Sequence, residues 1–238
     1  MVSSGLEFLA YAWIILSGIS FFVILLDMPQ QQVHMRVMKL VWPLTALYMG
    51  PIALYAYWVW GRVSVVHERH HDKRGADPLS SHAAMEHTNL HPAEPSWRGT
   101  FLSATHCGAG CSLGDIIGEI LIGSSGLIIG GSSLLTSYVV DFVLAFAMGI
   151  AFQYYSIVPM EGLTPSKGIR AALKADTLSL VAFEVGMFAW MAVGRTLVSS
   201  SPEDLVFWFM MQVAMMFGFA TSYPANWALI RRGIKHAM

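Results

Sequence analysis

The chain has 238 residues, of which 55% are hydrophobic and only 12% are charged, with a mean hydropathy of +0.55. Because soluble domains carry about 25% charged residues, this composition excludes an ordinary soluble protein and predicts an all-α membrane protein embedded in a lipid bilayer. The formal net charge is −1 and no basic run with interleaved aromatic residues occurs, so we expect no nucleic-acid partner.

Six apolar segments near twenty residues long predict six transmembrane helices. In chain order these are Leu6–Leu26, Val41–Trp60, Phe101–Gly123, Leu134–Val158, Ala172–Val198 and Leu205–Ala225. Pro43 and Pro51 predict a kink in the second helix. Gly108 and Gly110 are able to unwind the third helix locally.

The basic residues predict the orientation. With six spans and a cytoplasmic C-terminal tail, the cytoplasmic segments carry eleven Lys and Arg residues and the opposite side carries three. This positive-inside bias predicts that both termini are cytoplasmic.

One long polar segment divides the chain into three parts. We expect a two-helix transmembrane part over residues 1–61, a cytoplasmic linker over 62–98, and a four-helix transmembrane domain over 99–238. The linker holds six of the nine histidines: His67, His70, His71, His82, His87 and His91. Histidine tracts bind metal weakly, but the composition favours a solvated linker.

The third predicted helix combines a polar track with a packing groove. Cys107, Cys111, Asp115 and Glu119 are spaced four apart and form one stripe, with His106 directly before them. A second stripe of small residues, suited to close helix packing, consists of Gly110, Gly114 and Gly118.

Counting residues from the ends of the predicted helices gives the depth of each polar side chain in the membrane. Polar side chains on different helices fall at similar depths. His106, Gln153 and Asp176 fall about 6–8 Å inside the cytoplasmic ends at 1.5 Å per residue, with Tyr154 close by. Asp115 and Glu184 fall near the middle of the membrane, whereas Glu119 and Asp141 fall in its outer part. The four carboxyl groups Asp115, Glu119, Asp141 and Glu184 have no intramembrane Lys or Arg in this assignment, which favours a proton or cation path over structural satisfaction by neighbouring polar groups.

The donor types favour a soft metal. His106, Cys107 and Cys111 offer one imidazole and two thiols, which suit Cu(I) first and zinc second. On the predicted outer side, His34, Met35 and Met38 add further soft ligands. We therefore predict a protein that binds or transports copper, acting as a homo-oligomer or with a metal-handling partner protein.

Three alternatives stay open. The two cysteines suggest a membrane thiol-disulfide oxidoreductase, although their C-x-x-x-C spacing differs from the usual C-x-x-C. The carboxyl groups alone would suit a proton- or cation-coupled carrier, and polar groups that serve only helix packing would suit an accessory subunit. No hydrolase, phosphate-loop or zinc-protease motif occurs, so a protein that is not an enzyme is favoured.

Four strings of residues resemble those of an uncharacterised family. They are HCGAGCSLGDIIGE (106–119), FQYYSIVPM (152–160), ALKADTLSLVAFEVGMF (172–188) and PANWALIRRGIKHAM (224–238). From Ser96 onward the chain resembles a bacterial polytopic membrane-protein family, a domain of unknown function that carries the His-Cys-Gly-Ala-Gly-Cys motif. The resemblance implies a bacterial membrane protein with relatives near or fused to copper-related proteins, and it supplies no activity.

Overall fold

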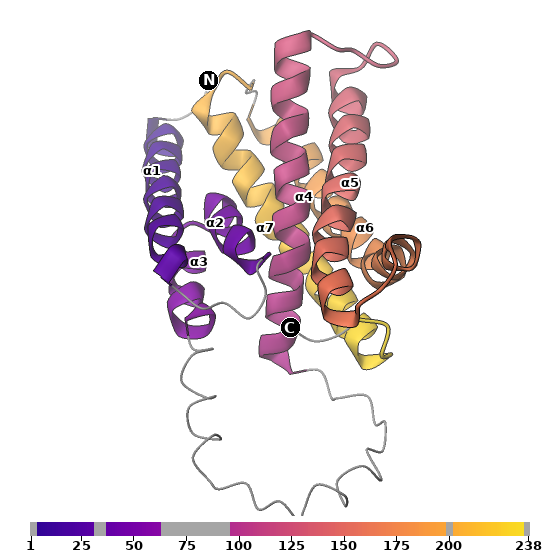
Figure 1. Ribbon diagram of the computed structural model, residues 1–238. Coiled ribbons are helices and arrows are strands. Elements are labelled where there is room, and N and C mark those ends of the chain that lie inside the picture. Colours follow the sequence, from indigo (N-terminus) through magenta and orange to yellow (C-terminus); the bar gives the residue numbers. More distant parts are fainter. Residues whose placement is uncertain (1–3, 31–36, 63–95, 199–201, 236–238) are drawn as a thin grey trace, which may run out of the picture.

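The computed structural model describes residues 4–30, 37–62, 96–198 and 202–235, and every regular element in these ranges is a helix (Figure 1). Five of the helices are long and apolar enough to cross a membrane. They are α1 (Ser4–Asp27), α4 (Trp97–Ser125), α5 (Ser133–Glu161), α6 (Pro165–Leu197) and α7 (Leu205–Arg231). Since these helices have 24 to 33 residues, each exceeds the roughly 30 Å of a bilayer core. The all-α, multi-pass membrane architecture is confirmed.

Local signals in the sequence set the ends of these helices. The Ser96 hydroxyl caps α4 by accepting a hydrogen bond from the Gly99 N–H at 3.0 Å. Gly126 and Gly162 end α4 and α5 with φ of 65° and 61°, values that suit glycine because it lacks a Cβ. Large apolar side chains stay exposed on the outer faces of the bundle, as a lipid environment requires.

The second predicted span, Val41–Trp60, is wrong. This stretch forms two short helices, α2 (Met38–Met49) and α3 (Pro51–Ala56), followed by one π-helical turn, η2 (Tyr57–Gly61). Gly50 divides them, with φ 54° and ψ −130°, and Pro51 begins α3 because proline fits the first turn of a helix.

The chain reverses at this break. The ring of Trp42, near the start of α2, packs against the ring of Tyr57 at a centroid distance of 5.5 Å and lies beside Gly61. Residues 38–61 therefore enter and leave on the same face as a re-entrant hairpin, where the sequence predicted only a kink.

The tip of the hairpin lies inside the bundle. Gln212 on α7 donates a hydrogen bond from Nε2 to the Leu47 carbonyl at 2.6 Å. Gly50 lies against Ser17 in the middle of α1, and the Tyr48 hydroxyl lies against Gly108 of α4. The hairpin thus reaches the helix that carries the His-Cys-Gly-Ala-Gly-Cys motif.

The hairpin also changes the predicted orientation. Ala10 of α1 packs with Val206 and Phe209 at the start of α7, whereas Asp27 at the other end of α1 bonds to Arg62 at 3.2 Å. The Ser4 end of α1 therefore lies on the face opposite to the Arg231 end of α7 (Figure 1). The prediction that both termini are cytoplasmic is wrong, because a hairpin does not change sides of the membrane.

The new orientation agrees better with the positive-inside rule. Nine basic residues of the described ranges lie in or beside segments at the face of Arg62, namely Lys39, Arg62, Arg98, Lys167, Arg170, Lys174, Arg231, Arg232 and Lys235. Arg195 is the one described basic residue near the opposite face. By the positive-inside rule, this distribution predicts that the C-terminal face is the cytoplasmic face and that the Ser4 end of α1 lies at the external face.

Candidate functional site: a buried polar column

Helix α4 runs without interruption through Gly108 and Gly110, so the local unwinding that these glycines permit does not occur. The three glycines of the small-residue stripe contact α5. A Cβ on Gly110 would lie 2.8 Å from the Gly149 Cα, and a Cβ on Gly114 or Gly118 would overlap Ala145 or Asp141. Close approach of α4 and α5 is what brings the polar groups of both helices together.

The inner layer of the column lies at the cytoplasmic end. His106 is fully buried and interacts electrostatically with Asp176 on α6 and Lys235 after α7. The Lys235 ammonium lies 2.5 Å from Asp176 Oδ1, and the Ser179 hydroxyl donates to the same oxygen at 2.6 Å. A full positive charge is thus held inside the bundle by one carboxylate.

The middle layer contains the thiols. Cys107 and Cys111 are both free and fully buried, and Cys111 neighbours Cys107, Glu184 and Asp115. Both carboxyl oxygens of Asp115 are buried and make no hydrogen bond to any described residue. Uncompensated carboxylates are costly at membrane depth, so a proton or a cation must neutralise them or water must solvate them.

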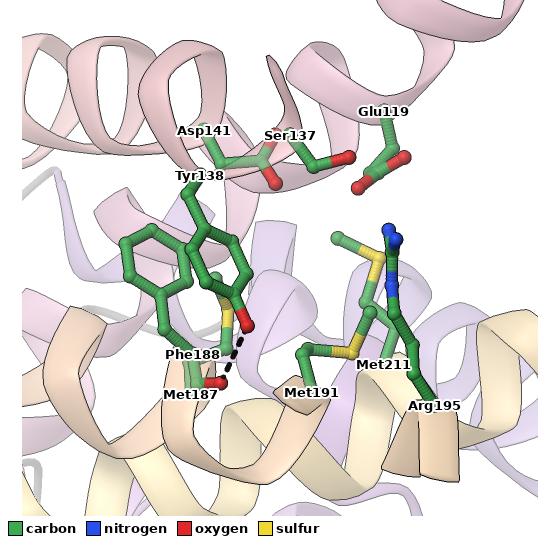
Figure 2. A pocket seen from close by; sticks show the side chains of 9 residues that line it. All are labelled: Glu119, Ser137, Tyr138, Asp141, Met187, Phe188, Met191, Arg195 and Met211. Carbon is green, nitrogen blue, oxygen red and sulfur yellow. Dashed lines mark hydrogen bonds between the residues drawn. The ribbon is translucent and has the colours of Figure 1, made fainter. Parts of the chain in front are cut away.

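The outer layer contains two acids that contact each other. Glu119 on α4 faces Asp141 and Ser137 on α5, and Figure 2 shows the three side chains on one side of a small cavity. Carboxylates only accept hydrogen bonds, so a bond between these two groups would need a proton on one of them. The cavity has a volume of about 10 Å³, enough for about one water molecule. Arg195 and three methionines, Met187, Met191 and Met211, also line it.

An open cavity of about 730 Å³ begins beyond this layer. Glu119 and Arg195 line it together with Asp204 and the connections that follow α4 and α6. The prediction that the membrane acids have no cationic neighbour is therefore wrong at this end, because Arg195 interacts electrostatically with both Glu119 and Asp141. The column opens toward the external face.

The structure brings together three of the layers that the depth estimates matched: His106 with Asp176, Asp115 with Glu184, and Glu119 with Asp141. Gln153 is buried on α5 with no hydrogen-bond partner for its Oε1 among the described residues. Tyr154 instead packs against Gly168 and Tyr155 at the edge of the bundle.

The predicted soft ligands do not form one cluster. His106 packs against Phe152 and interacts electrostatically with Asp176 and Lys235, whereas the two thiols lie near Tyr48 and Glu184. Across the described ranges, no three His, Cys, Asp or Glu side chains converge as metal ligands would. Met38 is buried at the start of α2, and His34, Met35 and the six linker histidines lie outside the described residues.

Sequence reasoning missed Tyr48 and the role of Lys235. The hydroxyl of Tyr48 reaches the column because the hairpin tip brings it to Gly108, where any side chain would overlap it. The signal for this approach was Gly50-Pro51, a pair that favours a chain reversal. For Lys235 the signal was Gly233, whose φ of 66° turns the chain back after α7.

These features define a multi-pass membrane protein in which four helices and a re-entrant hairpin surround a buried column of thiol, imidazole and carboxyl groups. The chain belongs to the family described as Domain of unknown function (DUF4396), which matches residues 96–235. Helices α4 to α7 and Lys235 fall within the match, whereas α1 and the hairpin precede it. No curated protein and no solved structure matches this chain.

Proposed function

We propose that the protein moves a soft monovalent metal cation, with Cu(I) first, across the inner membrane of a bacterium through this column. The observation that supports the proposal is the succession of two free thiols and four carboxyl groups, from three helices, along one buried path. Thiolates select Cu(I), and carboxyl groups are kept at membrane depth where something uses them.

In this proposal Cys107 and Cys111 bind the cargo as a pair, one helical turn apart. Glu184 and Asp115 lie next to that pair and compensate the positive charge as the ion leaves it. Glu119 and Asp141 continue the path to the external cavity. Zinc, the second expected metal, prefers four ligands in a tetrahedral arrangement and fits a two-thiol pair less well.

Copper uptake by the reconstituted protein tests the proposal. Under reducing conditions, the Cys107→Ser/Cys111→Ser variant is expected to lose bound copper and at least tenfold in uptake. Ser112→Ala is the matched control, since it removes a buried polar atom of the same helix without touching a thiol. Unchanged copper content and uptake in the double variant would contradict the proposal.

A second candidate, movement of protons alone, is supported by the two neighbouring carboxyl groups of Glu119 and Asp141, which face each other in the outer layer. Measurements of proton flux in vesicles that contain the reconstituted protein distinguish the two functions. Proton flux that survives the loss of both thiols but disappears in Glu184→Gln would favour the proton path. The exposed acid Glu161, changed to Gln, is the control because it lies at the end of α5, away from the column.

A further inference from the structure

The last described residues fold back into the bundle. After α7 ends at Arg231, Gly233 adopts φ 66°, and the Ile234 and Lys235 N–H groups donate to the Leu229 carbonyl at 3.0 and 3.3 Å. This turn directs the side chain of Lys235 inward, where its exposed fraction is 0%. A lysine that follows the end of a helix at one face of a bundle would ordinarily extend into water.

The ammonium group of Lys235 is surrounded by oxygen atoms of the kind that bind cations. Its ammonium contacts Asp176 Oδ1 at 2.5 Å and Asn226 Oδ1 at 2.7 Å. Asn226 is held in this orientation because its Nδ2 donates to the Ser222 carbonyl at 2.9 Å. Anionic and amide oxygens from two helices therefore point at one positive charge.

Unused ligand atoms belong to Asp176 itself and to His106, its electrostatic neighbour. The second carboxyl oxygen of Asp176 and both ring nitrogens of His106 are buried, and they make no hydrogen bond within the part of the chain that the structure describes. His106 interacts electrostatically with both Asp176 and Lys235. An imidazole, a carboxylate and an amide oxygen together suit a metal cation better than an ammonium group, which can only donate.

We propose that Asp176, Asn226 and His106 form an inner cation site, and that Lys235 is a tethered cation that fills this site while the path is closed. A cargo ion that reaches the site replaces the ammonium group of Lys235. The Lys235 side chain then moves out of the site by a rotation of the turn at Gly233. The chemical class of the cargo rests on the proposed function, whereas the closing role of Lys235 does not.

The energetics of buried ion pairs make such an exchange feasible. Taking both charges out of water costs nearly as much as their attraction returns, so a buried pair adds little net stability. Loss of one partner, in contrast, leaves an uncompensated buried charge. A cation that replaces the ammonium keeps the charge of Asp176 compensated throughout the exchange.

Labelling of the native thiols tests the closing role without any metal. Cys107 directly follows His106, and it and Cys111 are the only two cysteines of the chain. In inside-out vesicles, a membrane-impermeant maleimide is expected to label Lys235→Ala at least tenfold faster than wild type. Arg232→Ala is the control, because Arg232 is exposed in the same turn and is expected to react as wild type does.

The side of labelling separates opening from general loosening. Opening of the inner end raises the labelling rate only from the cytoplasmic face, whereas a loosened bundle reacts faster from both faces. Asp176→Asn is the second variant, since it keeps the shape of the site and allows Lys235 to turn out into water. It too is expected to label at least tenfold faster from the cytoplasmic face.

The proposal is overturned if folded Lys235→Ala and Asp176→Asn both label at the wild-type rate, or faster from both faces. It also fails if neither variant folds, because the pair is then a fixed part of the fold. Fast one-sided labelling without copper uptake would retain the closing role and reject only the copper cargo.

Discussion

Replacing Gly110 by alanine should separate α4 from α5. A Cβ at this position would lie 2.8 Å from the Gly149 Cα and 3.1 Å from its N, against 3.4–4 Å for ordinary contact. The two helices must therefore move apart by about 0.6 Å or more, and a gap of about 0.5–1 Å loses roughly a quarter to a half of the local van der Waals attraction. Added methyl groups in packed interiors typically cost about 1–3 kcal/mol.

Thermal unfolding in detergent measures this effect. For a chain of this size, a loss of about 2 kcal/mol corresponds to a decrease of about 4–8 °C in Tm. Because Cys107 and Cys111 are fully buried, a dye that fluoresces on reaction with thiols reports unfolding without any added label.

Gly123→Ala is the matched control for this measurement. It lies on the same helix, but a Cβ there would be 4.0 Å from its nearest neighbour, Pro202. We expect this variant to melt as wild type does. If Gly110→Ala and Gly123→Ala unfolded at the same temperature, the close α4–α5 contact would not contribute to stability and the packing argument would be wrong.

Two further predictions concern the hairpin and the orientation that follows from it. Gly50→Ala places a side chain at φ 54° against Ser17 and is expected to cost about 1–3 kcal/mol in the same thermal assay, whereas Gly18→Ala has no atom within 4 Å of the new Cβ and is expected to leave Tm unchanged. A protease-sensitive tag before α1 is expected to be cleaved only from outside the cell and one after α7 only from the cytoplasm; cleavage of both from the same side would restore the six-span topology.

Hydropathy was sufficient to find α1, α4, α5, α6 and α7, because the length of an apolar run is the property that a bilayer selects. It also sufficed to match Asp115 with Glu184, since a fixed rise per residue converts sequence position into depth along a nearly straight helix. It could not establish contact, and Tyr154 shows the difference: its depth was suitable, yet it packs at the bundle edge.

The hairpin was missed because mean hydropathy reports only how apolar a segment is. It does not report whether the chain crosses the membrane or turns back within it. Residues 38–61 are as apolar as a span, and only Gly50-Pro51 marks the reversal. Lys39 was independent evidence against the six-span assignment, because that assignment placed this basic residue on the external side, contrary to the positive-inside rule. The Lys235–Asp176 contact joins residues 59 apart in sequence, so no local pattern could reveal it.

The two ends of the column differ, and this difference has a mechanistic consequence. The end at Glu119 opens through a cavity of about 730 Å³, whereas a fully buried ion pair lies at the opposite end. Between them, the hairpin tip holds Tyr48 against Gly108, one residue after Cys107. If the column carries ions, this is therefore its outward-open state. The step that exposes the thiols to the cytoplasm must then displace Lys235, and movement of the hairpin alone would leave the inner end closed.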